Sequence, residues 1–371
     1  MPEVDSKSKL IEELLQRNII VEEYYFDFPY LRFKDDYKKY KRGTVVLEGN
    51  IIIPSYPKIA RIFVLEEGIK RHFRESFFIE EKADGYNVRV VKNKGEIYGI
   101  TRGGFICPFT TDRLRDLADF NSFFEQYPYY VICGEVVGPN NPYMELYPPY
   151  VKEDIAFLAF DIFDLQEERF LLPEDKYQIF KETGIPSVNV YGSFGPDMIE
   201  AVKDLILGLN QKEIEGVVFK SSTKPRKAYK YSTPLINIKD IEADAELLLD
   251  LPGQFFTQRI LRFILSVTEL NIPVGEEIKL RIGRAFIDEF KKCVKKFYVK
   301  GKVTREYTLY FNSLDNIYEF LKLEKKASTH VKIELKSIER SGNKYKVKLE
   351  KVFLDSTSKL KRITRGNVLY D

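Results

Sequence analysis

One stretch limits the fold of this chain more than any other, because it joins two strand-like patterns through a short turn signal. It reads Phe77-Phe78-Ile79-Glu80-Glu81-Lys82-Ala83-Asp84-Gly85-Tyr86-Asn87-Val88-Arg89-Val90-Val91. Asp-Gly between two such runs favours a hairpin, so we expect a tight turn at residues 84–85. Lys82 would then sit on or beside a rigid strand, between two acids. Taken alone, the stretch fits a solvated strand end equally well, because short motifs match by chance.

Other charged residues interrupt apolar strand patterns further along. Glu135 lies in an apolar run at 129–137, and Glu215 and Lys220 lie in an alternating run at 213–220. A charge in such a strand is costly to bury unless it is paired or used. The alternation places Glu215 on the same face as Val217 and Phe219, opposite Lys220.

Two more candidates lie beside loops. Arg102 precedes Gly103-Gly104, where the backbone can approach a ligand closely. Lys230 belongs to a dense cationic run at 224–231, for which a solvated loop is the alternative explanation.

Composition excludes several kinds of chemistry. With two histidines and three cysteines that form no C-x-x-C pair, neither histidine-based catalysis nor a zinc site or disulfide framework is expected. A net charge of +3 means that any polyanion site must come from local clustering of charge. No apolar run is long enough to span a bilayer and no signal peptide is evident, so we expect a cytoplasmic protein without membrane contact.

These residues occur in the order of the covalent nucleotidyltransferase motifs, which the chain resembles. The matching segments are Lys82-Ala83-Asp84-Gly85, Thr101-Arg102-Gly103, Gly134-Glu135, Phe157 to Asp161, Glu215-Gly216-Val217-Val218-Phe219-Lys220, and Lys227 to Tyr231. Asn87 and Glu81 match RNA ligases, since DNA ligases and capping enzymes usually carry Arg at the position of Asn87. Without the barrel pattern and terminal basic motif of DNA ligases, the chain is most similar to archaeal-type, homodimeric ATP-dependent RNA ligases.

The resemblance implies an α+β fold. Its core would be a nucleotidyltransferase (ATP-grasp-like ligase) domain of antiparallel sheets with flanking helices, followed by a helical region and a terminal β-hairpin. The expected domains are an N-terminal α/β domain (1–65), a catalytic domain (66–240), a helical, dimerising domain (241–327) and a C-terminal hairpin region (328–371). Helical patterns at 255–270, 276–297 and 313–325, and strand patterns around Ser341-Gly342-Asn343, agree with it.

It also implies roles for the candidate residues. Lys82 would attack the α-phosphate of ATP and carry AMP, after losing a proton that Lys220, Lys230 and a bound cation disfavour. The same cations would stabilise the charge that develops on the phosphoryl oxygens. Further implied contacts are phosphate or the RNA 5′ end for Arg102, ribose for Glu135, the adenine edge for Glu81, adenine stacking for Phe157 or Phe160, ATP for Asn87, and Mg²⁺, or alternatively Mn²⁺, for Glu215 with Glu135. The second lysine of the last motif is replaced by Ala228 or Ser232, and Lys227 is a candidate to compensate.

The expected reaction joins or circularises RNA that carries 5′-phosphate and 3′-hydroxyl ends, by way of an RNA-adenylate. Two alternatives stay open. One is a DNA ligase or capping nucleotidyltransferase, and the other is a non-catalytic RNA-binding protein.

Overall fold

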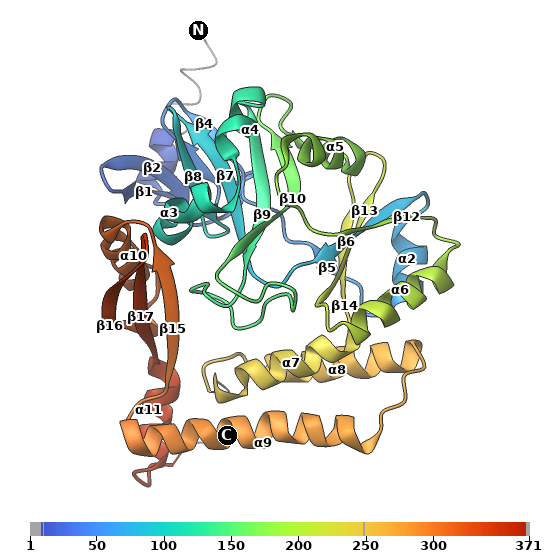
Figure 1. Cartoon of the computed structure of the whole chain (residues 1–371), viewed down its shortest axis with the longest axis vertical. Coiled ribbons are helices and arrows are strands. Elements are labelled where there is room, and N and C mark those ends of the chain that lie inside the picture. Colours follow the sequence, from blue (N-terminus) through green and yellow to red (C-terminus); the bar gives the residue numbers. More distant parts are fainter. Residues whose placement is uncertain (1–8, 10, 248, 369–371) are drawn as a thin grey trace.

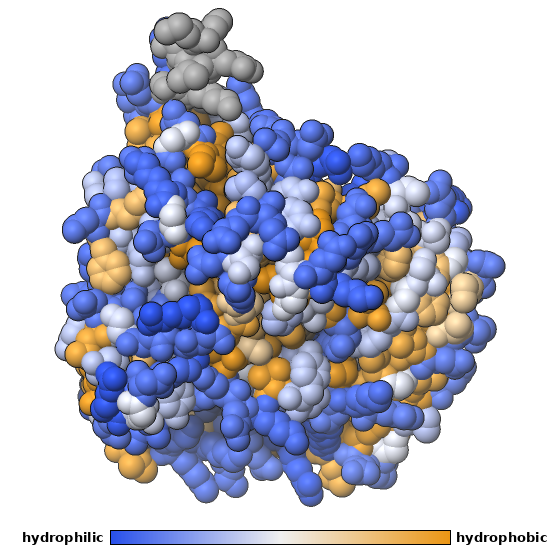
Figure 2. Space-filling model, turned by 45° about the horizontal axis from the view of Figure 1, so that its top comes forward, coloured by the Kyte–Doolittle hydropathy of each residue, from blue (hydrophilic) through white to orange (hydrophobic). Residues whose placement is uncertain are grey.

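The computed structural model describes residues 9, 11–247 and 249–368, and these residues form four β-sheets with helices on their outer sides (Figure 1). The first sheet is N-terminal and has the order β1-β2-β3-β4. Its strands are β1 (Ile20–Tyr25), β2 (Phe28–Phe33), β3 (Val45–Leu47) and β4 (Ile51–Ile53). On the face in Figure 2, hydrophilic side chains cover most of the rim and hydrophobic ones gather toward the middle.

Two five-stranded sheets form the centre of the molecule (Figure 1). One has the order β11-β10-β9-β7-β8, with β7 (Tyr86–Asn93), β8 (Glu96–Thr101), β9 (Tyr130–Val137), β10 (Ala156–Asp164) and β11 (Arg169–Phe170). The other has the order β12-β6-β13-β14-β5, with β5 (Ala60–Arg61), β6 (Phe77–Lys82), β12 (Val190–Phe194), β13 (Gly216–Ser221) and β14 (Ala228–Ser232). We refer to them as the β9 sheet and the β6 sheet.

Helices cover one face of each central sheet, because alternate strand residues there are apolar. Against the β6 sheet pack α2 (Leu65–His72) and α6 (Ile199–Gln211), whose buried residues share a core with Ile79, Val217 and Phe219. The core of the β9 sheet includes residues of α3 (Pro108–Leu117), α4 (Phe120–Gln126) and α5 (Pro173–Thr183). The opposite face of the β9 sheet packs partly on the N-terminal sheet, around Val91, Tyr98 and Val131, and the site lies between the rest of that face and the β6 sheet.

The predicted hairpin at residues 84–85 is wrong. β6 pairs with β12 and β13, whereas β7 pairs with β8 and β9, so the chain changes sheets at Asp84-Gly85 instead of turning back. Gly85 is required by crowding, since a Cβ there would lie 2.4 Å from the carbonyl oxygen of Val136. The turn signal therefore marks the passage from one central sheet to the other.

The helical region after residue 233 contains α7 (Pro234–Asp244), the 3-10 helix η1 (Ala245–Leu247), α8 (Gln254–Glu269) and α9 (Glu276–Lys300). The predicted helices at 255–270 and 276–297 are confirmed as α8 and α9. No described helix is both long enough and apolar enough to cross a membrane.

The terminal hairpin is confirmed, but it belongs to a larger sheet. β16 (Val331–Ser341) and β17 (Lys344–Phe353) pair across Gly342, and β15 (Thr304–Phe311) pairs with the other edge of β17. β15 falls inside the stretch expected to be helical. With α10 (Leu314–Ala327) it packs on the β9 sheet domain, where Phe311 and Phe320 meet Phe109. α11 (Leu354–Ile363) follows β17.

Candidate active site

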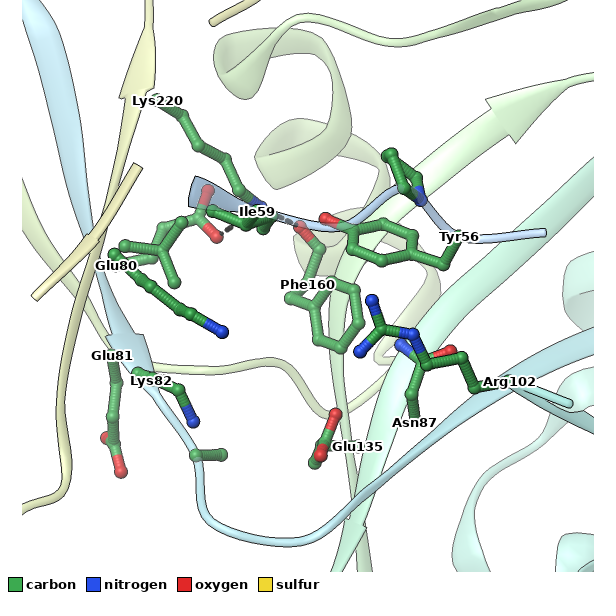
Figure 3. A pocket seen from close by; sticks show the side chains of 14 residues that line it. Tyr56, Ile59, Glu80, Glu81, Lys82, Asn87, Arg102, Glu135, Phe160 and Lys220 are labelled. Atoms are coloured by element: carbon green, nitrogen blue, oxygen red, sulfur yellow. Dashed lines mark hydrogen bonds and ion pairs between the residues drawn. The ribbon is translucent and has the colours of Figure 1, made fainter. Parts of the chain in front are cut away.

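A cavity lies where the two central sheets face each other (Figure 3). The β6 sheet, the β9 sheet and the segment before β5 all contribute to its walls. The lining residues are Tyr56, Pro57, Ile59, Glu80, Glu81, Lys82, Ala83, Asn87, Arg102, Glu135, Phe160, Val218, Lys220 and Lys230. Eight of the ten predicted site residues therefore meet in one cavity.

Lys82 lies at the end of β6 and forms an ion pair with Glu215. Burial alone would lower the pKa of this lysine, but the carboxylates of Glu215 and Asp84 outweigh burial and raise it. The expectation that nearby cations lower the pKa of Lys82 is therefore wrong for the structure without substrate. Its acidic neighbours favour the protonated form. A nucleophilic role for Lys82 would require the loss of both a proton and the contact with Glu215.

Glu215 does not follow the predicted alternation. β13 begins at Gly216, so Glu215 precedes the strand, and its carboxylate reaches Lys82 without lining the cavity itself. Val217 and Phe219 do point away into the core, as the alternation predicted. The backbone at Gly216 has a φ of +159° and lies so close to β14 that a Cβ would be 2.1 Å from the carbonyl oxygen of Tyr231.

The acidic residues can accommodate a divalent cation. One carboxylate oxygen of Glu215 is buried without a hydrogen-bond partner, and burial with the charge of Glu215 raises the pKa of Glu135 to about 8. Both carboxylates would gain from a bound cation. No group of three metal-binding side chains is found in the described part of the chain. Mg²⁺ typically takes one or two carboxylates and completes its shell with phosphate and water oxygens, so these residues fit that ion.

Two cations face the cavity without a carboxylate partner. Lys230, on β14, has a pKa lowered to about 8 by burial and by the positive charges of Arg61 and Lys82. Arg102 is exposed and forms no hydrogen bond or ion pair with the other described residues. Figure 3 shows its guanidinium group beside Asn87 and the ring of Phe160. Asn87 adds a buried amide oxygen that also lacks a partner.

Lys220 has a different environment from the one that the resemblance implied. Its amine is 2.6 Å from Glu80 and 3.0 Å from Asp161, and it donates to the carbonyl oxygen of Phe160 at 2.8 Å. Burial and the positive charges of Lys176 and Arg226 nevertheless lower the pKa of Lys220. Its contact with Phe160 supports the wall of the cavity.

Sequence reasoning missed most of the network around Lys220. Lys176 on α5 is fully buried and lies 2.5 Å from Glu80 and 3.1 Å from Asp161. Arg226 forms an ion pair with Asp161, and the hydroxyl of Tyr56 donates to Asp161 at 2.5 Å. The only sequence feature that could have predicted this network is the presence of acids at positions 80 and 161, in otherwise apolar strands. Lys176 and Tyr56 come from segments with no local sign of the contact.

The two aromatic candidates on β10 lie on different sides of the sheet. Phe160 lines the cavity, with its ring centroid 5.0 Å from that of Tyr56. Phe157 is buried against Phe120 of α4, at a centroid distance of 5.3 Å, and does not line the cavity. The expectation that Phe157 is an ATP contact is corrected by this placement, because its face of the sheet is covered by helices.

Glu81 and Lys227 also have partners other than those suggested. The Glu81 carboxylate accepts hydrogen bonds from the hydroxyl of Tyr150, at 2.7 Å, and from the amide of Asn189. Any contact with an adenine edge would therefore share this carboxylate with protein donors. Lys227 donates to the carbonyl oxygen of His72 at 3.2 Å and lies outside the cavity. It does not replace the missing second lysine.

This geometry agrees with the similarity of the chain to known proteins. Residues 75–232 match the RNA ligase family, and residues 244–367 match the family described as the ligase Pab1020 C-terminal region. Over 97% of its length the chain is 30% identical to an uncharacterised protein of Methanocaldococcus jannaschii, of which it covers 93%. The chain belongs to the RNA ligase family.

Solved structures agree with this family assignment. An archaeal ATP-dependent RNA ligase superposes with a TM-score of 0.89 at 26% identity, with 99% of each chain covered. A putative ATP-dependent DNA ligase from Aquifex aeolicus superposes with a TM-score of 0.91 at 38% identity, over 98% of this chain and all of that one. The predicted α+β fold with a nucleotidyltransferase core is confirmed, and so is the prediction of an RNA ligase enzyme.

Proposed function

We propose that this RNA ligase uses ATP to join or circularise RNA through a covalent lysyl-AMP on Lys82. The observation that carries the proposal is the position of Lys82, which pairs with Glu215 and lines a cavity together with Lys230 and Arg102, two cations that form no ion pair with the other described residues. A lysine nucleophile needs a means of losing its proton, and the transferring phosphate needs preorganised positive charge. Both are available within this cavity.

In the first step Lys82 attacks the α-phosphate and releases pyrophosphate. Phe160 offers a ring for stacking on adenine and Glu135 an acceptor for a ribose hydroxyl. Lys230 would stabilise negative charge on the α-phosphate oxygens. In the second step AMP passes to the RNA 5′-phosphate, and in the third the 3′-hydroxyl displaces AMP.

Mg²⁺, or alternatively Mn²⁺, would be held by Glu215 and Glu135 and would neutralise phosphate charge. Drawing Glu215 away from Lys82 would also remove the main contact that keeps the lysine protonated. The ion pair in the structure is therefore compatible with a resting enzyme.

The first test is the intact mass of the protein after incubation with ATP and Mg²⁺, for the native chain and for Lys82→Ala. We expect the mass of one AMP on the native chain and none on the variant. The starting protein must first be freed of AMP with pyrophosphate, because ligases can be isolated already adenylated. RNA binding without any adduct on either protein would instead support a non-catalytic RNA-binding role.

Because the chain is also similar to a putative DNA ligase, whether it seals RNA or DNA needs a test of its own. Nicked duplexes and single strands, with either RNA or DNA at the 3′-hydroxyl side, distinguish the two substrates. We expect sealing of RNA ends, and preferential sealing of all-DNA nicks would contradict the RNA assignment.

We further propose a homodimer formed through the helical region. On α8, Leu261 and Ile264 are exposed by about half, and on α9 Leu280 and Ile287 are exposed by 56% and 69%. Apolar side chains in helical register that remain uncovered are typical of a protein interface.

We place the enzyme in the cytoplasm, because all three cysteines are buried and free, as in a reducing compartment.

A further inference from the structure

Three arginines have no role in the mechanism above and lie outside the cavity lining, although one of them, Arg61, pairs with the cavity residue Lys230. Arg61 comes from β5, and Arg259 and Arg262 come from α8. Arg259 lies 2.8 Å from Asp240 of α7, and Arg262 lies 3.9 Å from the same carboxylate oxygen. Asp240 is the single carboxylate within 4 Å of any of the three among the described residues. The cluster therefore carries surplus positive charge.

The backbone of Arg61 pairs with Lys230, in the row of Glu80, but its side chain reaches toward the row of Lys82 across the β6 sheet. Lys82 pairs directly with Gly216, and Gly216 pairs with Ser232. The guanidinium group of Arg61 donates a hydrogen bond to the Ser232 hydroxyl. Two strand spacings place the Cα atoms of Lys82 and Ser232 about 10 Å apart. Gly216 lies between them and has no side chain, so a ligand can approach the backbone of the sheet closely at this point.

The charges of the cluster act on one another and on the site. Burial, together with the positive charges of Arg61 and Arg259, lowers the pKa of Arg262 to about 10. The negative charge of Glu215 has the opposite effect and favours a higher pKa for both Arg61 and Arg262. Like charges held this close are unfavourable until an anion joins them. The arrangement is typical of a phosphate-binding site.

In-line displacement indicates which phosphate would lie there. The group that leaves in the first step stands opposite the attacking Lys82 nitrogen across the α-phosphorus. The group that attacks in the second step must approach opposite the same nitrogen, because that nitrogen is now the leaving group. Pyrophosphate and the RNA 5′-phosphate therefore occupy one position in turn.

We propose that Arg61 and Arg262 form a phosphate subsite that binds the β-phosphate of ATP in the first step and the 5′-phosphate of RNA in the second. The inference rests on the proposed function and adds the residues that select both substrates. In step one the N–P bond to Lys82 forms, the bond from the α-phosphorus to the β-phosphate oxygen breaks, and the amine proton passes to water. In step two an RNA phosphate oxygen bonds to the α-phosphorus, the N–P bond breaks, and the nitrogen takes a proton from water.

The first experiment compares ATP with AMP at equilibrium. Binding is measured by calorimetry in the Lys82→Ala background, which prevents turnover, with and without Arg262→Gln. We expect Arg262→Gln to weaken ATP about tenfold and AMP by less than twofold. Arg71→Gln, an exposed arginine on α2 without a described partner, is the matched control and should change neither. Unchanged AMP binding also shows that the variant is folded.

The second experiment tests the RNA step. Lysyl-AMP enzyme, native or Arg262→Gln, is mixed with excess 5′-phosphorylated RNA, and AMP transfer is followed in a single turnover. We expect transfer to slow about tenfold in Arg262→Gln and to be native in Arg71→Gln. The shared subsite is overturned if ATP and AMP weaken equally, if neither weakens, or if only one of the two steps is affected. Failure of the proposed function looks different, because neither nucleotide would then bind and no lysyl-AMP would form.

Discussion

Phe157 and Phe160 lie three residues apart on β10, and their surroundings give them opposite roles. Strand alternation was enough to place them on opposite faces, but it left open which face the cavity occupies. That depends on the helices of the β9 sheet core, among which Phe157 is packed. Lys82, Glu135 and Lys230 were identified more easily, because each is a charge in or beside an apolar strand.

Substitution of the two phenylalanines should separate binding from stability. Phe160→Ala should raise the KM for ATP about tenfold, since stacking of a base on an aromatic ring is worth about 1–3 kcal/mol. Phe157→Ala should instead reduce the free energy of unfolding by about 3–5 kcal/mol, as for a large core side chain. Adenylation kinetics and urea denaturation on both variants check this. A stability loss as large for Phe160→Ala as for Phe157→Ala would contradict the assignment.

Among the secondary-structure elements, sequence patterns predicted strands and long helices well but not their partners. The strand patterns at 129–137 and 213–220 became β9 and β13, and the helical patterns at 255–270 and 276–297 became α8 and α9. The turn at Asp84-Gly85 was wrongly assigned to a hairpin. The Asp-Gly pair predicts that the chain bends there, but it does not predict which sheet the next strand joins. β15 was missed, because its eight residues lie between two helical segments and pair with β17 some 40 residues later.

The C-terminal sheet contains a carboxylate whose contribution to stability depends on pH. Glu350 on β17 is buried and lies 2.7 Å from Lys336, 3.0 Å from Lys302 and 3.1 Å from Lys300. These lysines hold its pKa well below the usual value. Its stabilisation is therefore present above the unfolded-state pKa of about 4.3 and is lost as the pH falls below it.

We expect Glu350→Gln to lower the free energy of unfolding at pH 7 by about 1–3 kcal/mol, the range for hydrogen bonds to charged groups. The difference from the native chain should shrink as the pH is lowered from 4 toward 2. Urea denaturation at each pH measures it. Glu339→Gln, on the exposed end of β16, is the control and should show little difference at any pH. A constant difference across this range would contradict the ionic explanation.

At the scale of the whole molecule, the domains predicted from the sequence are more separate from one another than the domains in the structure. Residues 56–61 belong to the expected N-terminal domain, yet Tyr56 lines the cavity and β5 forms the edge of the β6 sheet. Such long-range pairing has no local signature. The expected domain boundary at residue 65 lies between β5 and α2, so it separates part of the cavity wall from the rest.

The homodimer proposal belongs to this scale. Leu280→Asp combined with Ile287→Asp should shift the mass by light scattering from two chains to one, because two charges would be buried at the interface. Val299→Asp, near the end of the same helix and 87% exposed, is the control and should remain a dimer. A native chain that is already monomeric at micromolar concentration would overturn the proposal.

The pairing of β5 with β14 also bears on how the enzyme is made. β5 lies parallel to β14, with Arg61 opposite Lys230, so the segment made early must wait for a partner about 170 residues behind it. During synthesis, Arg61 has no strand to pair with until β14 has emerged from the ribosome. We therefore expect the nascent chain to complete its adenylation pocket only after residue 232 has left the ribosome. Lys82 will have left the ribosome about 150 residues earlier.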